Sequence, residues 1–112
     1  MKHMNSKMLI NDKNLNNIVL AGIVINTPIL SGSAENNDIR LDFDICHEIA
    51  PSYKIDTALK SSFNLHIKLA NELALAAEKK LKEGIECRIL GRLLLEEEGF
   101  TIYGSYIEIQ DK

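Results

Sequence analysis

The stretch from Ser62 to Leu95 constrains the fold of this 112-residue chain most, because the spacing of its apolar residues changes twice. Apolar and polar residues first alternate from Phe63 to Lys68, which is the two-residue period of a half-buried strand. The spacing then becomes that of an amphipathic helix, whose apolar face comprises Leu69, Leu73, Ala76, Ala77 and Leu81. Gly84 offers a left-handed cap after the helix, and alternation returns from Ile85 to Leu95. The stretch therefore predicts a strand, a helix and a second strand in direct succession.

Three further strands are predicted on either side of this unit. Asn17–Ile25 is a nearly continuous run of β-branched and other apolar residues, which is typical of a strand covered on both faces. Asp38–His47 alternates, with its apolar residues inward and its charged residues outward. Phe100–Gln110 forms the last strand after a tight turn at Glu96–Gly99. The chain thus holds five predicted strands.

Three segments lack a strand pattern. Residues 1–16 are polar and rich in asparagine and lysine, and we expect a mobile N-terminal arm that precedes one domain at 17–112. Residues 26–37 contain proline, glycine, serines and asparagines, which predicts a loop. Residues 48–61 form a longer connection with room for a helical turn.

The order of the predicted elements, β-β-β-α-β-β, indicates an all-β fold class. Gly22, Gly91 and Gly104 interrupt strands, and strand glycines mark the bends that a small β-barrel needs at its corners. Five strands with one helix between the third and the fourth is the order of the five-stranded OB-fold. A ferredoxin-like sandwich would need a second helix, for which the sequence has no candidate.

Composition excludes several classes of protein. The 46% hydrophobic and 26% charged content is that of a soluble globule, and no apolar run approaches the roughly 20 residues that span a bilayer. A net charge of −3 argues against a general polyanion binder but leaves room for a local basic patch. Cys46 and Cys87 are far apart and form no CxxC pair, which favours free thiols in a reducing compartment. We expect a cytoplasmic protein without membrane contact.

Residues that could perform catalysis are scarce. Asp44, Cys46, His47 and Glu48 are dense in potential metal ligands, but on a strand His47 points opposite to the other three. A solvated strand end explains them better than a metal site. Because no phosphate loop of the GxxxxGK type occurs either, we expect no enzyme activity, no cofactor and no metal.

Four motifs resemble the bacterial single-stranded DNA-binding proteins. Asn17–Gly22 (NIVLAG) resembles their opening strand, and Leu73–Gly84 resembles their helix and its exit. Ile89–Leu93 (ILGRL) resembles their fourth strand, and the closing strand with Ile107 and Ile109 also fits. The resemblance covers residues 16–110 and extends to primosomal protein B, a relative with the same barrel. It implies an OB-fold that binds single-stranded DNA in replication, restart or recombination, and dimers that form through the first strand.

Such binding needs aromatic rings for stacking on bases and cations along the phosphate backbone. Phe63 lies where the resembling family carries a stacking aromatic, although its strand parity fits a core residue equally well. Arg88 and Arg92 share one face of a strand, where the alternative is cross-strand pairing with glutamates. The predicted nucleic-acid-binding residues are Tyr53, Lys54, Lys60, Phe63, Lys68, Arg88, Arg92 and Tyr103.

Two departures from the family keep a second interpretation open. The sequence has no tryptophan, and the turn before the last strand is acidic at Glu96–Glu98, where carboxylates repel phosphates. The alternative is an OB-fold module for protein interaction or assembly with little nucleic-acid binding. RNA remains a second possible ligand, since stacking and phosphate contacts serve both polymers.

The first strand also predicts self-association. Its apolar residues occupy both faces, whereas the barrel interior takes only one, so the other face needs a cover. We expect a homodimer or tetramer, built by antiparallel pairing around Ala21–Ile23. The predicted interface residues are Ile18, Leu20, Ala21, Ile23 and Ile25.

Overall fold

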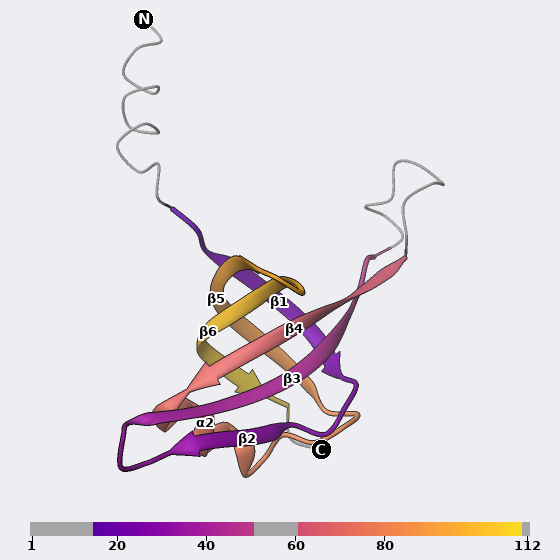
Figure 1. Cartoon of the computed structure of the whole chain (residues 1–112). Helices are drawn as coiled ribbons and strands as arrows, with labels where there is room; N and C mark the ends of the chain where they lie inside the picture. Colours follow the sequence, from indigo (N-terminus) through magenta and orange to yellow (C-terminus); the bar gives the residue numbers. More distant parts are fainter. Residues whose placement is uncertain (1–14, 51–60, 111–112) are drawn as a thin grey trace, which may run out of the picture.

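A computed structural model describes residues 15–50 and 61–110, which form six strands and one helix (Figure 1). The first three strands are β1 (Ile18–Val24), β2 (Ile29–Ser33) and β3 (Asp38–Glu48). They are followed by β4 (Ser62–Ala70), α2 (Asn71–Glu78), β5 (Glu86–Glu96) and β6 (Gly99–Ile109).

Five of the strands close into a barrel. β1 pairs antiparallel with β5 along Ile18–Ile23, and with β3 at Ile23 and Val24. β3 pairs antiparallel with β4, β4 pairs parallel with β6, and β6 returns antiparallel to β5. This ring, with the helix directly after β4, is the predicted OB-fold, and the prediction of an all-β barrel with one helix is confirmed.

The barrel interior is filled by one parity of each strand, as the alternation predicted. The outward residues of β3 are polar or charged, apart from Cys46, and the inward residues of β1 are Ile18, Leu20, Gly22 and Val24. Full burial of a valine, leucine, isoleucine or phenylalanine side chain contributes ~1.5–3 kcal/mol to stability. The largest buried side chains are Phe43, Leu41, Ile45, Ile67, Leu69, Ile89, Ile102 and Val24.

Helix α2 lies at the lower end of the barrel in Figure 1 and contacts β3, β4 and β6. Ala74 and Ala77 are buried there, and Leu81 is buried just beyond the helix. The predicted helical face is partly wrong, because Ala76 is exposed and Leu69 belongs to β4. The helix begins later than its apolar spacing suggests, since Asn71 adopts a φ of 52° that turns the chain sharply out of the strand.

Strand β2 lies within the segment that the sequence predicted as a loop. It pairs with β3 only, outside the barrel ring, and most of its residues are exposed. Gly32 is required there, because its φ is +95° and a Cβ would lie 1.7 Å from the Asp38 carbonyl oxygen. An edge strand held by backbone hydrogen bonds rather than by burial has no apolar alternation for the sequence to show.

The predicted bend at the strand glycines is confirmed at Gly91 and Gly104, which face each other across β5 and β6. A register shift follows, since Leu90 pairs with Tyr106 while Gly91 pairs with Gly104. A Cβ at Gly91 would lie 2.3 Å from the Tyr103 carbonyl oxygen, so only glycine allows this approach.

At the N-terminal boundary, Asn16 is attached to the barrel. Its side-chain Nδ2 donates to the Leu93 carbonyl oxygen (2.7 Å), and the Leu93 N–H donates to its Oδ1 (3.0 Å). Asn16 is therefore attached to the barrel, and residues 1–14 of the predicted arm lie outside the described residues.

Candidate nucleic-acid interface

Three of the predicted site residues form one row across the outer face of the barrel. Lys68 on β4 is in register with Tyr103 on β6, which in turn is in register with Arg92 on β5. The Lys68 Nζ lies 5.6 Å from the centre of the Tyr103 ring, and 37% of Tyr103 is exposed. An accessible ring between two cations is the combination that grips a single strand through its bases and phosphates.

Glu96, the last residue of β5, reaches over this row. Its carboxylate accepts hydrogen bonds from Tyr103 OH and Thr101 Oγ1, both at 2.8 Å, and pairs with Lys68 Nζ at 3.2 Å. The hydrogen bond from Thr101, followed by that from Tyr103, lowers the pKa of Glu96 to about 2. Burial lowers the pKa of Lys68, but the hydrogen bond to Glu96 and the charges of Tyr103, Glu96 and Asp42 together outweigh it, and the pKa is raised above 10.5. Both groups are therefore charged at neutral pH.

His66 lies one outward position away from Lys68 on β4, between two carboxylates of β3. Its Nε2 donates to Asp42 Oδ1 and its Nδ1 donates to Asp44 Oδ1, each at 2.7 Å. Burial lowers the pKa of His66, but the hydrogen bonds and charges of both aspartates together raise it by more. The pKa of His66 is therefore raised above its ordinary value of 6.5. Asp44 is also fixed by Asn26, whose Nδ2 donates to its Oδ2 at 2.8 Å. Both aspartates therefore favour the imidazolium form of the ring, whose hydrogen bonds join β3 and β4.

This arrangement predicts a stability that depends on pH. Because the folded-state pKa of His66 is raised, its contribution is complete below the unfolded value of 6.5 and is lost as the pH rises through the folded value. His66→Gln should cost up to about 1 kcal/mol below that pH, the range of half-exposed ion pairs. Thermal melts across pH should show the difference from wild type shrinking in alkaline buffer. A constant difference would contradict the imidazolium assignment.

Phe63 lies apart from this row, at the opposite end of β4. It follows the inward parity of Leu65 and Ile67 but is partly exposed, and its ring centre is 5.2 Å from that of His47. It lines a wholly apolar cavity of about 250 Å³ at the end of the barrel. Phe63 therefore contacts the core on one side and has an accessible ring on the other, and its role in base stacking stays a prediction. The cavity is lined by Ile18, Leu20, Phe63, Leu65, Leu93, Phe100 and Ile102.

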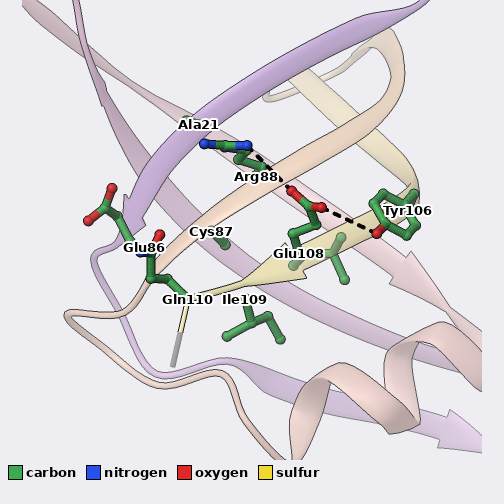
Figure 2. Close-up of a pocket in the computed structure, with 9 residues that line it drawn as sticks. Ala21, Glu86, Cys87, Arg88, Tyr106, Glu108, Ile109 and Gln110 are labelled. Atoms are coloured by element: carbon green, nitrogen blue, oxygen red, sulfur yellow. Dashed lines mark hydrogen bonds and ion pairs between the residues drawn. The ribbon is translucent and has the colours of Figure 1, made fainter. Parts of the chain in front are cut away.

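Arg88 lies on another surface, formed by β1, β5 and β6 (Figure 2). Its Nη1 is 3.6 Å from Glu108 Oε1, and Tyr106 OH donates to Glu108 Oε2 at 3.4 Å. The cross-strand pairing with a glutamate, which the sequence left open, is thus observed for Arg88. The exposed ring of Tyr106 was not among the predicted site residues.

The remaining predicted residues fall into two groups. Tyr53, Lys54 and Lys60 lie outside the described residues. The potential metal ligands near the end of β3 point to different partners, since Asp44 binds His66 while His47 Nδ1 donates to the Ala21 carbonyl oxygen at 2.7 Å. Within residues 15–50 and 61–110, no group of three histidine, cysteine or acidic side chains is placed to hold a metal ion.

Sequence reasoning missed Glu96, Thr101 and His66 as parts of the site. The acidic turn was interpreted as a repulsive tip, whereas the Glu96 carboxylate is turned onto Lys68. The aspartates of β3 were expected only as outward charged residues, whereas His66 binds them. Each pairing depends on strand register, and the only signal in the sequence was the outward parity of His66 and Lys68 on their strand.

Comparison with solved structures identifies proteins with the same fold. A small single-stranded DNA-binding protein from Streptomyces coelicolor superposes with a TM-score of 0.69 and 19% identity, covering 84% of this chain and 91% of that one. The second single-stranded DNA-binding protein of Mycobacterium smegmatis gives 0.67 and 12%, covering 85% and 88%. The single-stranded DNA-binding domain of a Synechococcus protein gives 0.66 and 14%, covering 84% and 94%.

No family model matches the sequence, and neither does any curated protein. At these identities the similarity establishes the fold, which is the OB-fold of bacterial single-stranded DNA-binding proteins over most of the chain. The single helix in the described part of the chain is too short to cross a membrane.

Proposed function

We propose that this protein binds single-stranded DNA without catalysing a reaction, and that it acts in the cytoplasm in replication, restart or recombination. The observation that carries the proposal is the row of Lys68, Tyr103 and Arg92 on the outer face of the barrel. The shared barrel supports it, since the three structural neighbours are named as single-stranded DNA-binding proteins.

One observation favours the alternative, an OB-fold module for protein interaction. Beside the row is a groove of about 390 Å³ whose lining includes Asp42, Glu96 and Glu98, and these carboxylates oppose phosphates. Three features offset these carboxylates. His66 neutralises part of the charge of Asp42 and Asp44, and Lys68 balances the charge of Glu96. The exposed ring of Tyr103 can stack on a base regardless of charge. Titration of a labelled oligothymidine at low and physiological salt separates the two functions.

We also propose that the protein is a homodimer, or a tetramer built from two such dimers. The outward parity of β1 consists of Val19, Ala21 and Ile23, all exposed and apolar, and Ile25 continues it beyond the strand. Val19 is in register with the exposed Leu90 of β5, which widens the apolar surface. A second copy of the same surface is the simplest cover for it.

Two details of the predicted interface need correction. Ile18 and Leu20 pack against the core, so the contact would be made by the opposite parity. Within Ala21–Ile23, Ile23 is in register with both Cys46 and Glu86, whereas Ala21 and Gly22 are in register with β5 alone in the described part of the sheet. Strand pairing with a second copy would have to use Ala21 and Gly22 and not Ile23. We therefore propose that two copies associate through the outward face of β1 and the adjoining part of β5.

Ile23→Glu is expected to weaken the dimer by a factor of about 100 or more, because an unpaired carboxylate in an interface costs several kcal/mol. Leu30→Glu on β2 is the matched control, since Leu30 and Ile23 are each 41% exposed. Light scattering at tens of micromolar should give a smaller mass for Ile23→Glu than for the control. A wild-type monomer at that concentration would contradict the proposal.

A further inference from the structure

Three hydrogen-bond donors converge on the carboxylate of Glu96. Thr101 Oγ1 donates to Oε1 and Tyr103 OH donates to Oε2, both at 2.8 Å. Lys68 Nζ lies 3.2 Å from Oε1 and 3.3 Å from Oε2, so that it bridges both oxygens. The donors are an ammonium and two hydroxyls, a set that recognises any compact anion with several acceptor oxygens.

The backbone of the three donors lies in the middle of the sheet, whereas that of the anion lies at a strand end. They stand on β4 and β6, which pair in the middle of the sheet, and Thr101 is only 3% exposed although it is on the outward parity. Glu96 is at the end of β5, next to the two-residue turn at Glu97 and Glu98. Its side chain has three rotatable bonds and can leave the donors without a change in strand pairing.

An exposed ring and a second cation lie beside the donors, and the groove that two of the donors line also contains the carboxylates of Asp42 and Glu98. Lys68 and Thr101 line the open groove of about 390 Å³, and the exposed Tyr103 ring lies between Lys68 and Arg92. A phosphate of a single strand whose base stacks on Tyr103 would come within reach of the same donors that now bind Glu96.

We propose that Lys68, Thr101 and Tyr103 form a phosphate-binding site that Glu96 occupies in the free protein, and that a phosphate of the single strand displaces this carboxylate. The inference rests on the proposed function, and it assigns the regulation of single-strand binding to the side chain of Glu96. Because hydrogen bonds from Thr101 and Tyr103 lower the pKa of Glu96 to about 2, the carboxylate is ionised at every working pH. A phosphate therefore has to displace the carboxylate, because protonation does not remove its charge. This competition weakens the binding of nucleic acid and makes the binding selective for strands whose bases also stack.

The test compares Glu96→Gln with Glu97→Gln, which removes the same charge from the exposed neighbouring position. Glu96→Gln should bind oligothymidine about 3- to 10-fold more tightly at low salt, because the phosphate no longer has to displace a carboxylate from Lys68. Its salt slope should stay near that of wild type, since Lys68 contacts the same phosphate in both complexes. Glu97→Gln should change the affinity by less than about twofold, since an exposed charge is screened. Adding Lys68→Met to Glu96→Gln should abolish the gain.

A second arm uses inorganic phosphate as the probe, followed by NMR of the Lys68, Thr101 and Tyr103 signals. Phosphate should shift these signals in Glu96→Gln and leave them unchanged in wild type and Glu97→Gln. Equal gains in the two glutamine variants, or no phosphate shift in Glu96→Gln, would overturn the inference while the proposed function stands. If no protein in the series retains oligothymidine at low salt, the proposed function fails and the inference fails with it.

Discussion

Leu81→Glu is expected to unfold the domain. Leu81 is 6% exposed and packs in the core with Ala74 and Ala77. An unpaired carboxylate at that position costs several kcal/mol, against a total stability of ~5–15 kcal/mol for a domain of this size. Circular dichroism should show either no cooperative melting transition or one lowered by well over 10 °C, given a shift of about 4–8 °C per kcal/mol.

Leu75→Glu is the matched control, because the same substitution falls on the outward side of α2, where Leu75 is 41% exposed. It should leave the melting temperature within a few degrees of wild type, as surface substitutions generally do. Equal melting curves for the two variants would show that α2 does not close the barrel as described.

Tyr103→Ala is expected to weaken the binding of single-stranded DNA by ~1–3 kcal/mol, the cost of losing one base stack. Phe63→Ala should have an effect in the same range if a base reaches the end of the barrel. Tyr103→Phe should retain most of the affinity, because the ring is kept and only the hydroxyl bound to Glu96 is lost.

Tyr106→Ala is the control for these variants, since this ring is also exposed on β6 but lies on the surface that contains Arg88. Fluorescence anisotropy with a labelled oligothymidine should give wild-type affinity for Tyr106→Ala and reduced affinity for Tyr103→Ala. If Tyr106→Ala has the larger effect, DNA crosses the β1–β5–β6 surface instead of the proposed row.

The barrel was predictable because its inward and outward residues alternate cleanly. In β3 the alternation from Asp38 onward separated the core from the surface, and the glycines of β5 and β6 marked the bend. The boundaries of α2 were less predictable, since Leu69 and Leu81 are buried like helical residues but lie outside the helix. The sequence shows only that these two leucines are buried. A leucine at a strand end or in a turn can be buried as fully as one in a helix.

The site was predictable only as a set of residue types. Tyr103 and Arg92 were named from their strand parity and Lys68 as a cation. Their alignment depends on the parallel pairing of β4 with β6, which neighbouring residues in sequence do not encode. The pairing of Lys68 with Glu96 spans 28 positions and that of His66 with Asp42 spans 24. Such contacts decide how much positive charge the face offers to a phosphate.

The most direct test of the central claim is titration of wild-type protein with labelled oligothymidine at low and physiological salt. Saturable binding at low salt is expected, and affinity should fall on a log–log plot by about 0.7 per phosphate contact. Arg92→Ala should reduce that slope by one contact, because Arg92 is in register with Tyr103. Failure of the wild-type protein to bind the oligothymidine even at low salt would contradict the claim and favour the protein-interaction module.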